Sequence, residues 1–350
     1  MKNKNNEFWG ITAFFNPAHY KNKYQNYKIF REQSKKQGLK LIAVELAFKG
    51  ADFELKKGDA EKIIRVRSDS IMWQRERLLN IALSHLPKKC NKFAWLDADL
   101  IFKNPFWIKK TSDLLEDYKI VQLFQYVFLL NENKFDAHGR IENGEKGIGE
   151  VYNEKTNLNL KPYSGFAWAA RKSVFKKIGF YDKMVLGSGD ILLLDAFRGI
   201  EPDVTKGVYY LVSNTLRKEL LKWQREIRKK VNKKYTYLQG DILHLNHGAL
   251  KNRMYSYRLR ILSKYSFNPY KDLRMNKSGV YEWATSKNEL HEWIEDYFKL
   301  RNEENKHTKL KGHLYNLLDI LDIKFGILNE FAKKNLPNLH KKLKELMKKN

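Results

Sequence analysis

The stretch FAWLDADLIF (residues 93–102) places two carboxylates, Asp97 and Asp99, directly after an apolar run that predicts a buried strand. In open α/β sheets, ligands bind outside the carboxyl ends of the strands, where these side chains would lie. Their hard oxygens suit Mg²⁺ or Mn²⁺, ions that neutralise a diphosphate. An Asp-x-Asp pair also fits a plain surface turn, but the apolar flanks favour a ligand-binding site.

Strands and helices are predicted to alternate on the N-terminal side of this stretch. Apolar runs predict strands, and amphipathic runs predict helices that end near Gly38 and Pro87. This order predicts an α/β fold with a mainly parallel sheet flanked by helices. The run 120–130 predicts one more buried strand, and 216–231 predicts a basic amphipathic helix. The predicted strands of the N-terminal side are 8–15, 39–46, 63–66 and 93–96, and its helices are 20–37 and 73–86.

Length and composition predict one large domain with an appendage. The chain has 350 residues, so it can bury a full core, and we expect a catalytic domain over 1–300 and a basic helical appendage over 301–350. A single cysteine, Cys90, excludes a disulfide framework and suits a reducing compartment. No apolar run approaches the roughly 20 residues of a spanning helix, so we expect a cytoplasmic protein.

The net charge of +27 favours an anionic partner: nucleic acid, an acidic membrane surface or a phosphorylated substrate. A lysine-rich compositional bias, with the charges spread over a solvated surface, explains the same number. The charge is concentrated in the helix at 216–231 and in the C-terminal tail. This helix also has an apolar side, which can dock on the body of the protein or lie at a membrane interface.

Three further segments carry residues suited to chemistry. Gly187-Ser188-Gly189-Asp190 predicts a close backbone approach to a ligand, with Asp190 either a helix cap or a base. His244 and His247 in HLNHG have a spacing that can face one metal ion. Arg75, on the helix before the carboxylates, offers a planar fork to phosphate, although a solvated charged face is the simpler alternative. The polar, glycine-containing stretch 136–161 predicts a long loop that could close over a ligand.

In order along the chain, five segments resemble the β-1,4-galactosyltransferases and related families with the nucleotide-sugar-binding fold called GT-A. WLDADLIF is similar to their Asp-x-Asp strand, and Arg75 falls on the arginine of their Phe-Asn-Arg-x-x-Leu-Leu-Asn helix. Asp190 falls among the acids of their glycine-rich segment. His247 matches their metal-binding histidine, and His244 matches the preceding sulfur ligand. The segments are 11–27 (ITAFFNPAHYKNKYQNY), 73–80 (WQRERLLN), 95–102, 163–199 (beginning YSGF) and 244–248 (HLNHG).

The resemblance implies a metal-dependent hexosyltransferase that moves a sugar from a nucleoside diphosphate, a UDP-sugar first of all, to a hydroxyl acceptor. Asp190 would be the base of an inverting reaction. Mn²⁺ or Mg²⁺ would be held by Asp99, His247 and His244, with Asp97 a further candidate ligand near the ribose or the sugar. The implied nucleotide-sugar-binding residues are Phe15, Asn16, Arg75, Asp97, Asp99, Gly165 and Gly189.

Several alternatives stay open. Retaining GT-A families carry a His-x-x-Gly-x-x-Lys segment, and Gly248 and Lys251 fit it, but Leu245 stands where the histidine belongs. A basic nucleic-acid-binding protein or a metal-dependent nuclease would also explain part of the pattern. For the acceptor we expect a glycan, lipid-linked or phosphorylated, as in surface-polysaccharide assembly. The enzyme would then bind the inner membrane face peripherally, with hydroxylated DNA as the competing acceptor.

Overall fold

The computed structural model describes residues 7–130, 145–146, 163–198, 207–210, 212–255 and 257–304. Two predicted features lie outside these residues. They are the loop 136–161, apart from the two-residue strand β8 (Glu145–Lys146), and the basic appendage beyond residue 304.

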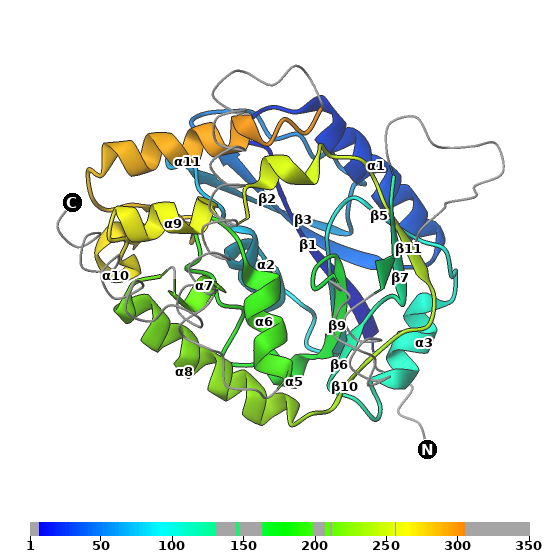
Figure 1. Cartoon of the computed structure of the whole chain (residues 1–350). Helices are drawn as coiled ribbons and strands as arrows, with labels where there is room; N and C mark the ends of the chain where they lie inside the picture. The colour runs from blue at the N-terminus through cyan, green and yellow to red at the C-terminus, as the bar shows by residue number, and fades with distance from the viewer. Residues whose placement is uncertain are drawn as a thin grey trace, which may run out of the picture.

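The centre of the molecule is a seven-stranded sheet in the order β10-β6-β9-β4-β1-β2-β3 (Figure 1). β9 runs antiparallel to both of its neighbours, and the other four pairs are parallel. The predicted α/β fold with a mainly parallel sheet is therefore confirmed. The strands are β1 (Glu7–Phe15), β2 (Lys40–Phe48), β3 (Lys62–Ser68), β4 (Cys90–Leu96), β6 (Ile120–Gln122), β9 (Ala167–Arg171) and β10 (Tyr235–Tyr237).

A second sheet contains β5 (Leu100–Phe102), β11 (Asp241–His244), β7 (Tyr126–Leu129) and β8, in that order. The prediction of one strand over 120–130 was wrong, because the run divides between the two sheets. The Leu123 amide still donates to the Ala167 carbonyl beside β9, whereas the Gln125 amide donates to the Gly240 carbonyl before β11. The backbone changes partners between these two residues, and the strand ends there.

Helices cover both faces of the central sheet (Figure 1). Along β4, Phe93 and Trp95 pack into one hydrophobic cluster while Ala94 and Leu96 pack into another. Alternate residues of a strand point to opposite faces, so a strand buried on both sides is apolar throughout. The helices are α1 (Lys21–Lys36), α2 (Arg75–Ser84), α3 (Trp107–Leu114), α5 (Lys172–Phe175), α6 (Gly189–Arg198), α7 (Gly207–Tyr210), α8 (Asn214–Val231), α9 (Tyr257–Lys264), α10 (Pro269–Asp272) and α11 (Asn288–Leu300), with a 3₁₀ turn η1 (Leu250–Arg253) and a hairpin β12 (Leu273–Met275) and β13 (Tyr281–Trp283).

The basic helix α8 is docked on the body of the protein. Leu216, Leu220 and Ile227 on its apolar side are fully buried, and Trp223 donates to the Gly179 carbonyl at 3.0 Å. The sequence allowed this apolar side to dock on the body of the protein or to lie at a membrane interface. In the structure it packs into the core. None of the described helices combines the length and apolar composition needed to cross a bilayer.

Replacing Leu220 by Ala should lower the free energy of unfolding by about 2–5 kcal/mol, because it leaves a cavity under α8. The matched control is Lys222→Ala, which removes an exposed side chain two residues away and should change stability by less than about 0.5 kcal/mol. Urea unfolding followed by circular dichroism measures both. Equal small effects would mean that α8 does not depend on its apolar side.

Candidate active site

Asp99, His244 and His247 come together because β5 and β11 pair antiparallel. In this pairing His244 lies opposite Leu100, and the Leu245 amide donates to the Asp99 carbonyl at 2.8 Å. The histidine at the end of β11 therefore lies beside the aspartate that precedes β5. The turn that follows β11 carries His247 back to the same place.

The three side chains form a group that suits a divalent cation. His244 Nε2 lies 3.5 Å from Asp99 Oδ1, and His247 Nδ1 lies 3.9 Å from Asp99 Oδ2. One ligand atom from each residue falls within 4.8 Å of the others. Asp99 Oδ1 is buried and receives no hydrogen bond from any described residue. A buried carboxylate oxygen without a donor is costly, and a cation would compensate it.

Electrostatics keep Asp99 and His247 in the protonation states that bind a metal. Burial opposes the charge of Asp99, but the neighbouring imidazoles, His244 foremost, hold its pKa well below the usual range. Burial, together with Arg253 and His244, lowers the pKa of His247 to about 3. The ring of His247 therefore stays neutral at pH values far below about 6.5, the pKa of a free histidine. A neutral imidazole is the form that binds metal.

A second charged group surrounds Arg75 at the start of α2. Its guanidinium donates to Asp97 Oδ1 from Nε at 2.9 Å and from a terminal nitrogen at 2.6 Å. The other terminal nitrogen reaches both Glu76 and Asp190 at 3.2 Å. One buried cation thus compensates three carboxylates. The two aspartates of the Asp-x-Asp pair separate, with Asp97 in this group and Asp99 in the histidine group.

Asp190 is held where α6 begins, and its carboxyl is unusually basic. Burial raises its pKa to about 7, an increase that Arg75 opposes and that Asp97 and Glu76 reinforce. A carboxyl with a pKa near neutrality can accept a proton and still be ionised at the working pH.

The predicted glycines make room for this group. A Cβ atom on Gly189 would lie 2.3 Å from Glu76 Oε1, and one on Gly165 would lie 3.2 Å from Asp190 Oδ2. The first distance is far inside van der Waals contact, so the Gly189 backbone can approach Glu76 only because it lacks a side chain. Gly165 and Gly189 therefore shape the carboxylate group and need not touch a ligand themselves.

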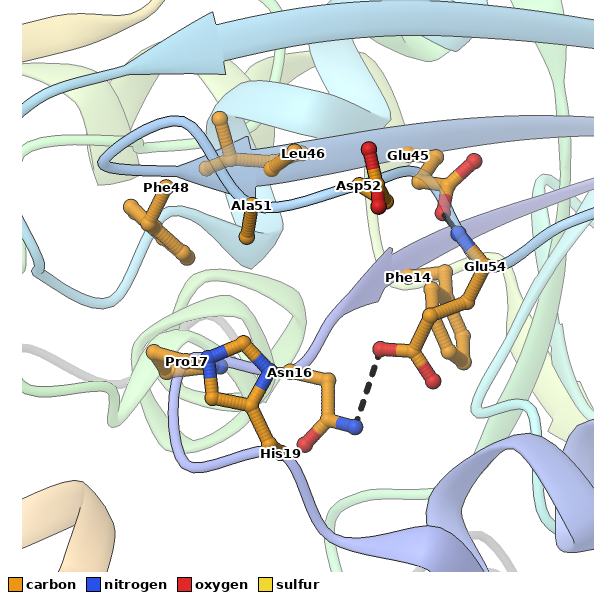
Figure 2. A pocket seen from close by; sticks show the side chains of 11 residues that line it. Phe14, Asn16, Pro17, His19, Glu45, Leu46, Phe48, Ala51, Asp52 and Glu54 are labelled. Atoms are coloured by element: carbon orange, nitrogen blue, oxygen red, sulfur yellow. Dashed lines mark hydrogen bonds between the residues drawn. The ribbon is translucent and has the colours of Figure 1, made fainter.

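A pocket at the carboxyl ends of β1 and β2 holds the predicted Asn16 (Figure 2). Asn16 Nδ2 donates to Glu54 at 3.0 Å, and Asn16 Oδ1 accepts from the Tyr20 amide at 3.0 Å. Burial raises the pKa of both Glu45 and Glu54. Phe15 is not among the lining residues, and its ring packs edge to face against Trp73 at 5.3 Å. The lining residues are Phe14, Asn16, Pro17, His19, Glu45, Leu46, Ala47, Phe48, Ala51, Asp52 and Glu54.

Two contributors to the site, Glu45 and Glu303, are not among the residues predicted from the sequence. Glu45 lies inside the apolar strand KLIAVELAF, where an isolated buried carboxylate was a usable signal. Glu303, beyond α11, is buried and pairs with Arg301 at 2.7 Å, with Lys23 at 3.6 Å and with Arg253 at 3.8 Å. Nothing in the local sequence around residue 303 indicates that it packs beside the HLNHG turn.

The turn itself depends on this packing. Gly248 has a φ of 90°, and a Cβ atom there would lie 2.7 Å from the Asn302 carbonyl oxygen. Arg253 donates to the His247 carbonyl at 2.8 Å. The segment after α11 therefore packs against the loop that carries His247 and supports it, although about fifty residues separate the two in the sequence.

No family model matches the chain, and no curated protein matches it in sequence. Solved structures are similar to it in shape. A 1–349 fragment of S. aureus TarS in complex with UDP-GlcNAc shares 10% identity, with 89% of this chain and 79% of that chain covered and a TM-score of 0.38. The chain spans 39% of a longer TarS structure.

Two further solved structures show the same low level of similarity. Glucosyl-3-phosphoglycerate synthase from Mycobacterium tuberculosis, with Mg²⁺ and UDP, shares 12% identity, with 79% and 87% covered and a TM-score of 0.39. A Drosophila β-1,4-galactosyltransferase 7 mutant with manganese, UDP-Gal and xylobiose shares 13% identity, with 54% and 61% covered and a TM-score of 0.28. The function of this chain therefore has to follow from its own residues.

Replacing His247 by Ala should weaken Mn²⁺ binding by at least about 100-fold, because it removes a direct ligand, and loss of an outer partner of a ligand already costs about 10–100-fold. Titration of free Mn²⁺ by electron paramagnetic resonance measures the affinity directly. His85→Ala, at an exposed position after α2, is the control and should bind Mn²⁺ like the unmodified protein. An unchanged affinity in His247→Ala would remove this residue from the metal site.

Proposed function

We propose that the protein is a metal-dependent glycosyltransferase of the GT-A type that uses a nucleoside-diphosphate sugar, a UDP-sugar first of all. The observation that carries the proposal is that the Asp-x-Asp pair links two groups of side chains, the histidine group around Asp99 and the charged group around Arg75. Asp99 belongs to a cluster suited to a metal, and Asp97 is bound to the arginine that also holds Asp190. Asp97 and Asp99, on either side of Ala98, thus connect the candidate cation site to the arginine that holds the basic carboxyl of Asp190.

The donor nucleoside would occupy the pocket at the ends of β1 and β2. Carboxylates at the carboxyl ends of parallel strands commonly accept hydrogen bonds from ribose hydroxyls. Glu54 and Asp52 line this pocket beside Asn16. Lys23, whose Nζ lies 5.4 Å above the Phe15 ring, stands on the α1 side of the same region and lowers the pKa of Asp99. Such a cation would face the diphosphate.

Asp99, His244 and His247 would hold Mn²⁺ or Mg²⁺. A divalent ion held there would neutralise the charge of the departing diphosphate. The remaining chemistry belongs to side chains of the chain. Asp97, fixed by two hydrogen bonds from Arg75, would accept a hydrogen bond from the ribose or the sugar.

Asp190 would act as the general base. As the acceptor oxygen bonds to the anomeric carbon, the bond from that carbon to the diphosphate breaks, and the acceptor proton passes to Asp190. Attack from the side opposite the leaving group inverts the anomeric centre. The competing mechanism, retention, predicts a product with the donor's own anomeric configuration, and proton NMR of the first product distinguishes the two.

For the acceptor we propose a glycan hydroxyl, on a lipid-linked or phosphorylated chain at the inner face of a membrane. The exposed side of α8 supports an anionic partner through Lys218, Lys222, Arg225, Lys229 and Lys230, only one of which forms an ion pair among the described residues. Hydroxylated DNA is the competing acceptor, and salt-dependent binding of duplex DNA would favour it.

The donor can be tested by thermal shift with UDP-, GDP-, CMP- and dTDP-sugars, each with and without Mn²⁺. A ligand at 100 times its Kd adds about 2.7 kcal/mol of stability, which is a shift of several degrees for most domains. We expect one nucleotide class to stabilise the protein, and only with Mn²⁺. Stabilisation by none of them would contradict the proposal.

The rate should rise with pH through a midpoint near 7, because Asp190 must be ionised to accept the acceptor proton, and burial raises its pKa to about 7. Asp190→Asn should lower kcat by about 10²–10⁴-fold and leave donor binding nearly unchanged. A pH–rate profile with a hydroxyl acceptor measures the midpoint and kcat, and calorimetric titration of the donor measures its binding. Full turnover in Asp190→Asn would exclude it as the base.

Two neighbours of Asp190 should move this midpoint in opposite directions. Glu76 raises the pKa of Asp190 and Arg75 lowers it. Glu76→Gln, which keeps the side-chain shape, should therefore shift the profile to lower pH, and Arg75→Gln should shift it to higher pH. Identical midpoints in all three proteins, with intact folds by circular dichroism, would show that Arg75 and Glu76 do not tune the base.

A further inference from the structure

A groove of about 530 Å³ lies between α2 and the segment 172–182, which begins with α5, away from the residues placed in the active site. α2 contributes one wall through Arg77, Asn80 and Ser84. The segment 172–182 contributes the other. The lining residues are Arg77, Asn80, Leu83, Ser84, Lys172, Phe175, Lys176, Lys177, Ile178, Gly179, Phe180, Asp182 and Tyr281.

The second wall is fixed to its surroundings. Asn80 Oδ1 accepts from the Phe180 amide at 2.7 Å, and Asn80 Nδ2 donates to the Phe180 carbonyl at 2.9 Å. Gly179 has a φ of 70°, and a Cβ atom there would lie 2.7 Å from Asn80 Oδ1. Its carbonyl accepts from Trp223 on α8. The groove is therefore formed in advance of any ligand.

The groove carries an excess of positive charge. Four cations line it against one carboxylate, Asp182, which already pairs with Arg77 at 3.3 Å. Lys176 and Lys177 are exposed and pair with no carboxylate among the described residues. Within the described part of the chain, Lys172 Nζ donates a single hydrogen bond, to the Leu86 carbonyl at 3.3 Å. Lys183, the next residue after Asp182, is paired with Glu219, so the three lysines of the groove differ from it.

We propose that this groove binds phosphate groups along an extended anionic acceptor whose terminal hydroxyl reaches Asp190. The inference rests on the proposed glycosyl transfer. Ammonium groups are compact charges that bind phosphate oxygens. The groove is hollow and fixed, which suits a chain better than a flat membrane surface.

Helix α2 connects the two places. Arg75, its first residue, holds Asp190, and Ser84, its last, lines the groove. A helix rises about 1.5 Å per residue, so Ser84 lies roughly 13 Å along the helix axis from Arg75, the residue that holds Asp190. A monosaccharide cannot occupy both ends, whereas a phosphate-linked chain of a few units can.

Lysine footprinting tests the site directly. The metal-free protein is acetylated with and without linear tripolyphosphate, and each lysine is quantified by mass spectrometry. We expect protection of Lys172, Lys176 and Lys177, and none of Lys109 and Lys110 on α3. Equal reactivity of the groove lysines with and without the probe would overturn the proposal.

The paired variants Lys176→Gln/Lys177→Gln and Lys109→Gln/Lys110→Gln remove the same charge from the groove and from α3. The groove variant should bind tripolyphosphate about tenfold more weakly, and the α3 variant should bind it like the unmodified protein. An equal loss of tripolyphosphate affinity in the two paired variants would show that binding responds only to net charge, and it would overturn the proposal. The proposal would also be overturned if the groove variant bound phosphatidylglycerol vesicles more weakly but bound tripolyphosphate like the unmodified protein.

Donor binding separates this proposal from the proposed function. UDP affinity with Mn²⁺ should be the same in both paired variants, because neither touches the donor site. If no nucleotide binds to any of the proteins, glycosyl transfer fails and the link to an acceptor fails with it, whereas the footprint still reports a phosphate site in the groove. If nucleotides bind but no groove lysine is protected, only the groove proposal fails.

Discussion

The site depends on the single guanidinium of Arg75, which is buried and compensates three carboxylates from three parts of the chain. The Glu76 carboxylate is buried, and those of Asp97 and Asp190 are partly exposed. Asp97 follows β4, Glu76 follows Arg75 on α2, and Asp190 begins α6. Removing one partner of a buried ion pair leaves an uncompensated charge, which costs about 3–5 kcal/mol. Arg75 therefore fixes the position of α6 relative to the sheet, and it limits how far the pKa of Asp190 can rise.

The separation of Asp97 from Asp99 follows from the change of sheet after β4. The Asp97 amide still bonds to the Phe166 carbonyl beside the central sheet, whereas the Asp99 carbonyl accepts from Leu245 beside the second sheet. Two residues apart in sequence, the aspartates face different partners. One carboxylate is thereby neutralised by a guanidinium, and the other is left for a cation between two imidazoles.

The features of the structure that depend on local sequence patterns were predicted well. Strand and helix periodicity located β1 to β4, α1, α2 and α8, and Asp-x-Asp and HLNHG supplied the three clustered residues. The sequence did not predict the break between β6 and β7, because which strand each half pairs with is decided by residues 167 and 240, far away in the chain. Neither Glu303 behind His247 nor the pairing of Arg75 with Asp97 has a local signal.

The central claim is that one divalent ion is shared by the histidine cluster and a nucleoside diphosphate. Calorimetric titration of UDP with and without Mn²⁺ tests it most directly, because coupling between two ligands is reciprocal. Mn²⁺ should tighten UDP binding at least about tenfold, UDP should tighten Mn²⁺ binding by the same factor, and Asp99→Asn should abolish both effects. UDP binding that is equally tight without Mn²⁺, or no UDP binding at all, would contradict the account.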